Sequence, residues 1–236
     1  MKRIERRRQG RLFGSVGEWT HMALYDCSHP IETGMPTYPG DPAVSLSPHA
    51  THDEDGYRVT RVGMGSHAGT HIDAPAHTEP DGETLDAYAV DRFRFDARLV
   101  DARSFGAREP IPPGVVPETD ADMVVFVTGW DTHWGTPQYR DHPYLDPATA
   151  ERCAGAGYHV ATDTLNPDPT PTDAAEPGEP TGVPAHRTLL GAERFVIENL
   201  TALGRLPERV WLHAYPLAID ADGAPIRAVA ETPEVG

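Results

Sequence analysis

The chain has 236 residues, a formal net charge of −16 and an apolar fraction of 39%. This length suits one domain, or at most two small ones, with a sizeable buried core. The negative charge repels phosphate backbones and argues against nucleic acid as a partner, and no stretch approaches the roughly 20 apolar residues that a membrane-spanning helix needs.

The first 22 residues differ from the rest of the chain in charge. The opening stretch "MKRIERRRQGR" is basic, and we predict residues 1–22 to be a loosely docked arm, with contact to a membrane or an anionic partner as the alternative. Residues 23–236 are predicted to form a single domain. The apolar stretch after the basic residues is too short for a secretory signal, and the widely spaced Cys27 and Cys153 are predicted to be reduced thiols, so we expect a cytoplasmic protein.

Short runs rich in β-branched and aromatic residues predict strands along the chain. Residues 57–64 alternate apolar and polar side chains, as a half-exposed strand does, whereas residues 122–130 and 158–164 resemble buried strands. Two more strands are predicted over residues 209–219 and 225–231. The turn "DADG" before the last of these predicts that the two form a hairpin.

Two helices are predicted. The first covers residues 146–157, because Asp146 can cap it, Pro147 takes the first helical position and Gly155 or Gly157 can end it. The second is predicted over residues 191–203. Strand, helix and strand in succession predict one parallel crossover unit in a mixed α/β domain with more strand than helix.

Residues 166–184, "NPDPTPTDAAEPGEPTGVP", form the one low-complexity stretch. Proline has no N–H donor and cannot sit in a helix interior or a central strand. We therefore predict a long, Pro-rich surface loop inserted into the domain.

The stretch "HAGTHIDAPAH", residues 67–77, crowds three histidines and an aspartate among small side chains. Its glycine and proline argue against a helix. On an extended path His71 and Asp73 point to the same side, and a turn at Gly69 brings His67 round to join them.

Two imidazoles and a carboxylate that converge in this way are the ligands of a divalent metal of the Zn or Mn kind. His77 is then either a fourth ligand or a proton shuttle. An overlapping dinucleotide fingerprint at residues 63–68, "GMGSHA", needs a helix that opens at its glycines, and the nearby prolines oppose one.

The pattern H-x-G-T-H-x-D-x-P-x-H in this stretch resembles the signature of the metal-dependent cyclase-like hydrolases, which include bacterial kynurenine formamidases, isatin hydrolases and polyketide cyclases. The resemblance extends over residues 23–230, through "LYDCSHPIETGMPTYPGDP" near the start and "VPAHRTLLGAERFVIENLTAL" towards the end. It implies an α/β fold, a cyclase-like swivelling β/β/α domain with a strand-rich mixed sheet. It also implies a homodimer or homotetramer.

The resemblance further implies roles for individual residues. It places one or two divalent ions, Zn or Mn, on five ligands: His67, His71, Asp73, His186 and Glu198. His77 matches the general acid/base of the family, and Tyr38 stands where formamidases have a substrate-contacting tryptophan. From the residues alone, His186 is only a weak candidate for a ligand, and Glu198 falls on a solvated face of the second predicted helix.

The activity implied is that of a metal-dependent amidohydrolase on a small-molecule substrate. Metal-bound hydroxide would attack an aryl formamide such as N-formylkynurenine, with His77 as general acid/base. One alternative is a hydrolase of cyclic amides or lactones, such as isatin. Another is a metal-dependent cyclase of aromatic polyketide biosynthesis, which Tyr38 and the long insert at residues 166–184 keep open. A metal-containing binding protein without turnover is the last alternative.

Overall fold

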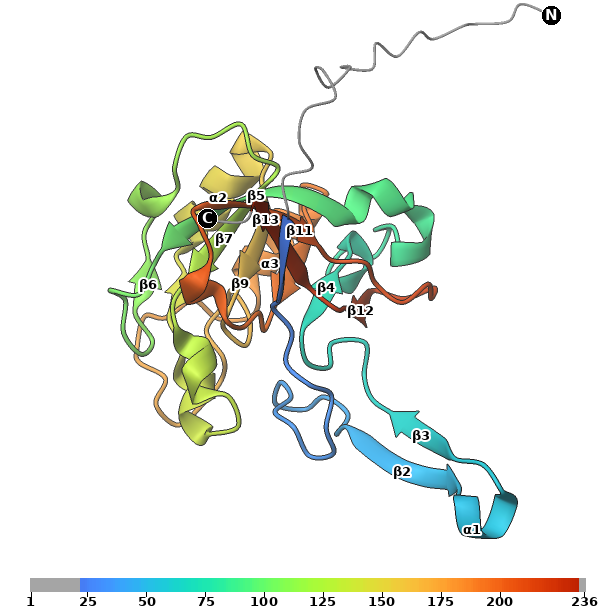
Figure 1. Ribbon diagram of the computed structural model, residues 1–236. Helices are drawn as coiled ribbons and strands as arrows, with labels where there is room; N and C mark the ends of the chain where they lie inside the picture. Colours follow the sequence, from blue (N-terminus) through green and yellow to red (C-terminus); the bar gives the residue numbers. More distant parts are fainter. Residues whose placement is uncertain (1–21, 234–236) are drawn as a thin grey trace, which may run out of the picture.

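A computed structural model describes residues 22–233, which are built around one large mixed sheet (Figure 1). The basic arm predicted at residues 1–22 lies almost entirely outside this range. The sheet has nine strands, in the spatial order β1 (Met22–Asp26), β13 (Val229–Pro233), β11 (Arg209–His213), β5 (Arg94–Asp101), β7 (Met123–Val127), β9 (His159–Thr162), β10 (Val196–Glu198), β4 (His71–Asp73) and β12 (Gly223–Pro225). The mixed, strand-rich α/β fold predicted from the sequence is confirmed.

The centre of the sheet is parallel and its two flanks are antiparallel. Strands β5, β7, β9 and β10 run in the same direction, while β11 and β4 pair with this block antiparallel. Helix α2 (Pro147–Ala156) connects β7 to β9, which confirms the predicted crossover unit. Asp146 caps this helix by accepting a hydrogen bond from the Ala148 N–H, and Gly157 ends it with a φ of 85°.

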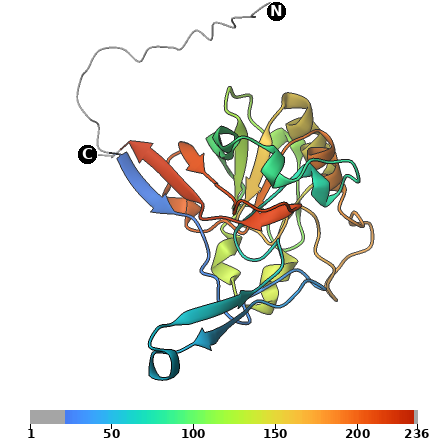
Figure 2. The ribbon, with the colours of Figure 1, turned by 90° about the vertical axis from the view of Figure 1, so that its right-hand side faces the viewer.

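Both faces of the central strands are buried. On β7, Val124 and Phe126 pack in the core beneath α2 and α3 (Pro184–Gly191), while Met123 and Val125 pack in the core on the other face. This second core also contains Ala224 of β12 and Ala230 of β13. Strands near the two opposite ends of the sheet therefore contribute side chains to the same core. Figures 1 and 2 show the resulting curl.

The prediction of a helix over residues 191–203 is wrong. Helix α3 ends at Gly191, and β10 follows as a buried strand between β9 and β4. Glu193, Asn199 and Ala202 have φ values of 58°, 56° and 60°, which no right-handed helix contains. The short apolar run before Glu198 fits the sheet, and burial on both faces outweighs any helical preference.

The Pro-rich stretch, residues 166–184, contains no helix or strand before Pro184, as predicted, but it is not all surface. Residues 166–170 are buried. Arg108 holds the rest of the stretch against the body of the protein. Its guanidinium donates to Thr170 O at 3.0 Å and forms an ion pair with Glu179. The prediction of a surface loop therefore holds only for the later part, because the first residues enter the core beside α3.

The last predicted hairpin is confirmed in outline. β11 pairs antiparallel with β13, and a bridge between Pro216 and Ile226 continues the same pairing. The turn "DADG" leads into β12, which pairs with β4. The segment after the turn therefore contacts two different strands.

Two small sheets lie outside the main one. Strands β6 (Pro110–Ile111) and β8 (Tyr144–Leu145) form a short parallel pair. Strands β2 (Ser45–Ala50) and β3 (Val59–Gly63), joined through α1 (His52–Asp55), form a hairpin that projects from the body (Figure 1). β3 confirms the strand predicted over residues 57–64.

Cys27 and Cys153 are free, buried thiols, and burial raises their pKa values to about 11 and about 12. Both are therefore protonated at neutral pH, in agreement with the prediction of reduced cysteines. Among the helices between residues 22 and 233, none combines the length and the apolar character that crossing a membrane requires.

Candidate metal centre

The pairing of β4 with β10 brings the first ligands together. His71 lies directly opposite Glu198 in the register, and Asp73 lies opposite Val196. Side chains two residues apart share a face of a strand, so His71, Asp73 and Glu198 all project to one side of the sheet. His71 Nε2 is 3.1 Å from Glu198 Oε2 and 3.3 Å from Asp73 Oδ1.

A turn at Gly69 brings in His67, as the sequence predicted. Gly69 has a φ of 66°, and a Cβ there would also stand 2.8 Å from Ile31 Cδ1, so glycine suits this position. The turn places His67 Nδ1 2.8 Å from Asp73 Oδ1.

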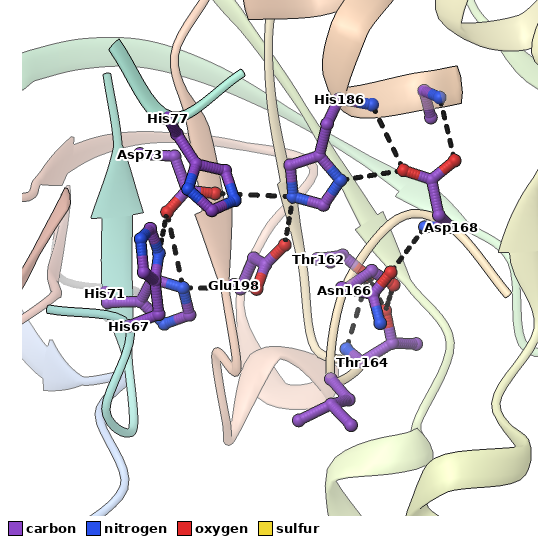
Figure 3. Close-up of polar contacts among 12 residues, drawn as sticks. His67, His71, Asp73, His77, Thr162, Thr164, Asn166, Asp168, His186 and Glu198 are labelled. Atoms are coloured by element: carbon purple, nitrogen blue, oxygen red, sulfur yellow. Dashed lines mark hydrogen bonds and ion pairs between the residues drawn. The ribbon is translucent and has the colours of Figure 1, made fainter. Parts of the chain in front are cut away.

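Helix α3 supplies His186 from above the sheet. The carboxylate of Asp168 accepts the backbone N–H groups of Ala185 and His186 at the first turn, and so fixes the start of the helix. The same carboxylate is 2.7 Å from His186 Nδ1. Figure 3 shows His186 between Asp168 on one side and Glu198 and Asp73 on the other, with His186 Nε2 2.9 Å from Glu198 Oε1.

The five predicted ligands form two groups that share Asp73. His67, His71 and Asp73 make one group, and Asp73, His186 and Glu198 make the other; in each, one ligand atom per residue lies within 4.8 Å of the others. Asp73 is completely buried. Asp73 is therefore the residue through which the two groups of possible ligands meet.

The outward-facing nitrogen of each imidazole has a hydrogen-bond partner. His71 Nδ1 is 2.8 Å from Gly69 O, His186 Nδ1 faces Asp168, and His67 Nε2 is 2.9 Å from Asp222 Oδ2. A neutral imidazole that donates its outward proton presents a lone pair on the inward nitrogen. All three rings are therefore oriented as metal ligands usually are.

The fit to a metal is tested by three buried atoms. His71 Nε2, Asp73 Oδ2 and Glu198 Oε1 make no well-formed hydrogen bond, although each lies within ion-pair distance of another charged group of the cluster. Buried polar groups of this kind are rarely left without one. A divalent cation among them would satisfy all three, and nitrogen and carboxylate ligands suit both Zn and Mn. The residues present therefore fit a metal centre.

Without a metal, protonated histidines balance the negative charges of the carboxylates in the cluster. Burial opposes the charge on His71, but Asp73 and Glu198 outweigh it and raise the pKa of the imidazole well above its usual value. For Asp73, burial is likewise outweighed by His71 and His67, which hold the pKa of the carboxyl well below its usual range. Because a cation would replace the protons on the imidazoles, metal uptake should release protons.

His77 and Tyr38 line the cavity that opens onto this cluster. The cavity has a volume of about 300 Å³. His77 ends a short 3-10 helix (Pro75–His77), its side chain is 29% exposed, and its Nδ1 is 3.2 Å from Asp222 Oδ2. Its ring centroid lies 4.0 Å from that of His67 and 5.5 Å from that of His186. The structure thus brings all seven predicted site residues to one place.

Sequence reasoning missed two carboxylates beside the site, Asp168 and Asp222. Asp168 lies within the stretch predicted to be a surface loop, and Asp222 lies in the turn before β12. Asp222 joins His67 and His77 through a single oxygen and accepts a hydrogen bond from Ser66. No local motif marks either residue, because their partners are distant in the sequence.

His213, predicted to be a core histidine with its polar atoms satisfied, lies on β11 away from this cluster. Its Nε2 is 3.0 Å from Glu231 Oε2 on the neighbouring strand β13, and its side chain is 22% exposed. It is therefore a partly buried residue with a partner, which agrees with a structural role.

Comparison with known proteins agrees with this architecture. The family described as "Putative cyclase" matches residues 25–169. A kynurenine formamidase of Salinibacter ruber is 31% identical over 88% of this chain and 97% of its own length. Among solved structures, an isatin hydrolase bound to the product analogue thioisatinate aligns with a TM-score of 0.76 at 22% identity, over 90% of this chain and 93% of its own. A protein described as a potential metal-dependent hydrolase with cyclase activity aligns with a TM-score of 0.71 at 27% identity, over 91% of this chain and all of its own.

Proposed function

The chain belongs to the cyclase family, and from this premise we propose that it is a metal-dependent amidohydrolase that cleaves the C–N bond of an aryl formamide, with N-formylkynurenine as the leading substrate. The observation that carries the proposal is the buried cluster of three histidines and two carboxylates at the floor of an open cavity. Its support from relatives is the kynurenine formamidase that matches almost the whole chain.

Two cations of the Zn or Mn kind would be held by five residues. His67, His71 and Asp73 would hold one, and His186 and Glu198 would hold the other together with Asp73. A bound cation of this kind lowers the pKa of water towards neutrality and polarises a carbonyl oxygen. Asp168 and the carbonyl of Gly69 would keep the rings of His186 and His71 in place for this task.

His77 is the residue that moves the proton. It stands at the cavity wall next to the ligand cluster, with one ring nitrogen held by Asp222 and the ring partly open to solvent. As general base it takes a proton from the attacking water, and as general acid it returns one to the leaving nitrogen. Asp222 orients the ring for both steps.

Tyr38 would contact the aromatic part of the substrate. It lines the cavity together with Leu165 and Val183, which offer an apolar wall beside the polar cluster. The phenol ring supplies a flat surface for stacking and a hydroxyl for a hydrogen bond.

A cyclic amide such as isatin is the second candidate substrate. Among the described residues, no Lys or Arg lines the cavity, whereas Asp41, which is not one of the proposed metal ligands, does. Such a lining favours an uncharged ring over a substrate that carries a free carboxylate. A relative in fold, the isatin hydrolase, binds thioisatinate.

A homo-oligomer, dimeric or tetrameric, is the expected assembly, and a cytoplasmic location agrees with the two free cysteines. Support for self-association comes from the projecting β2–β3 hairpin. It exposes Tyr57, Val59 and Val62 by 58%, 40% and 52%, and isolated two-stranded hairpins are marginally stable in water.

The test is a turnover assay on metal-analysed protein with N-formylkynurenine and isatin in parallel. Release of formate that stops on chelation supports the formamidase activity, and opening of isatin alone supports the second candidate. Absence of turnover on both, with metal fully bound, would refute the amidohydrolase proposal.

A further inference from the structure

A second cleft has a volume of about 290 Å³ and is lined by Arg92, Arg94 and Arg194. It lies where the central strands begin, at the opposite end of β10 from the metal centre. Arg94 is the first residue of β5, and Arg194 comes two residues before β10. The parallel strands β5, β7, β9 and β10 all begin at this edge. Glu198 of the metal centre ends β10, about 13 Å further along the strand from Arg194.

These three arginines keep much of their donor capacity. The side chain of Arg92 has no hydrogen bond or ion pair within residues 22–233, and its guanidinium stands 5.9 Å from the Phe195 ring. Arg194 donates to two backbone carbonyls, Ala192 O at 3.0 Å and Gly157 O at 3.1 Å. Arg94 stacks on Trp211 and comes no closer than 3.7 Å to a carboxylate, that of Glu231.

Several other arginines of the chain are bound more tightly to acidic groups. Arg209 and Arg227 each hold a carboxylate through two short hydrogen bonds, and Arg108 is held by Glu179 and Asp141. The sequence has 36 acidic against 20 basic residues, so acidic partners are abundant. This cleft differs from those ion pairs because three arginines line it together and none has a carboxylate closer than 3.7 Å.

His159 adds a fixed donor to the cleft. The imidazole is buried, stacks on Phe195 with an interplanar angle of 16°, and accepts the Phe195 N–H on Nδ1 at 2.8 Å. A neutral imidazole that accepts on Nδ1 carries its proton on Nε2. This Nε2 has no partner in the described part of the chain, so it is free to donate to a molecule in the cleft.

Two carboxylates, Asp91 and Asp122, also line the cleft. Asp122 is engaged, since its Oδ2 accepts the Asp96 N–H at 3.2 Å. Three arginines therefore line the cleft against two aspartates, in a chain whose net charge is −16. The balance of charge and of donors therefore favours an anion in this cleft.

We propose that this arginine cleft binds a small molecule that carries a phosphate group. A phosphate offers three strong acceptor oxygens and close to two negative charges, which match several guanidinium donors and an imidazole N–H. The cleft is larger than a bare phosphate, so a phosphate monoester of a small metabolite fits. This binding site does not depend on the amidohydrolase activity, because it uses other residues at another edge of the sheet.

The test uses inorganic phosphate on the full-length, metal-loaded protein, with chloride at equal ionic strength as the reference. Calorimetric titration and the unfolding temperature are compared in the wild type, Arg92→Gln and Arg152→Gln. Arg92 makes no hydrogen bond that its loss would break, and Arg152 is an exposed arginine of α2 outside the cleft. We expect phosphate to raise the unfolding temperature of the wild type and Arg152→Gln, and to bind Arg92→Gln about tenfold more weakly.

Phosphate can also reach the metal centre, and the cleft variants separate the two sites. A phosphate response that is the same in the wild type, in Arg92→Gln and in Arg92→Gln/Arg194→Gln would place the anion elsewhere and overturn the proposal. No response in the wild type would overturn it as well. Malonate provides the carboxylate comparison: a response to malonate without one to phosphate would refute the assignment to a phosphate.

Discussion

His71 on β4 and His159 on β9 are both buried imidazoles of the same sheet, but their neighbours carry opposite charges. Asp73 and Glu198 outweigh the burial of His71 and raise its pKa. Burial lowers the pKa of His159 to about 3, and the nearby Arg194 and Arg92 add to this effect. The comparison shows that one edge of the sheet is built to hold cations, while the other gathers cationic groups beside a neutral donor.

The two edges also differ in how their ring nitrogens are used. In the metal centre each outward nitrogen is held by an acceptor, so each ring in its neutral, metal-binding form presents a lone pair on the inward nitrogen. At His159 the buried nitrogen is itself the acceptor, so the other nitrogen carries a proton. Substitutions at both ends of the central strands therefore test whether the two sites differ in this way.

The largest effect is expected for Asp73→Asn. Because Asp73 belongs to both ligand groups, the amide should weaken both cation sites at once and reduce kcat/KM by roughly a thousandfold or more. Elemental analysis of the purified variant should show less bound metal. The exposed Asp81→Asn is the control, and an Asp73→Asn protein with full metal content and normal turnover would contradict the assignment.

A smaller loss is expected for Asp168→Asn, which changes the partner of His186 Nδ1 without removing a ligand. Partners of this kind typically contribute about 10–100-fold to metal affinity. A competition titration with a chelator measures the change. The control is Asp173→Asn in the exposed part of the same segment; equal metal affinity in both variants would show that Asp168 serves only to start α3.

Asp222→Asn should lower kcat more than it changes metal content. Its carboxylate holds both His67 and His77, so the amide should misorient the general acid/base and reduce kcat by about 10–100-fold. Steady-state kinetics and metal analysis are measured together, with exposed Asp220→Asn as control. Loss of metal in proportion to activity would indicate that Asp222 acts through His67 alone.

The smallest effect concerns stability at low pH. The pKa of His159 is about 3 in the folded protein and about 6.5 when unfolded, so its contribution is complete above pH 6.5 and is lost as the pH falls towards 3. His159→Asn keeps a side-chain acceptor but cannot titrate. The free energy of unfolding should therefore fall less steeply below pH 6.5, by about 1.4 kcal/mol per pH unit. Urea unfolding between pH 5 and 7 measures the slope, with His49→Asn as control; equal slopes would refute the neutral, buried state of His159.

The part of the site that is local in sequence could be predicted from the residues alone. His67, His71 and Asp73 converge because of strand alternation and one glycine turn, and both can be deduced from eleven residues. His186 and Glu198 needed the resemblance to a family, since their positions depend on how α3 and β10 meet β4. Neither the local sequence pattern nor the resemblance to a family identified Asp168 and Asp222.

The fold was predictable where capping and apolar patterns agree. Helix α2 has its cap, its proline and its terminal glycine in the expected places. β10 was predicted wrongly as helix, because a three-residue buried strand has no periodicity of its own. Its identity is set by β9 and β4 on either side, and the sequence does not reveal those neighbours.

The most direct test of the metal centre is to titrate chelated, metal-free protein with Zn or Mn while formate release from N-formylkynurenine is followed. We expect no turnover without metal, and recovery that reaches a plateau at no more than two ions per chain. Undiminished turnover in protein that elemental analysis shows to be free of metal would contradict it.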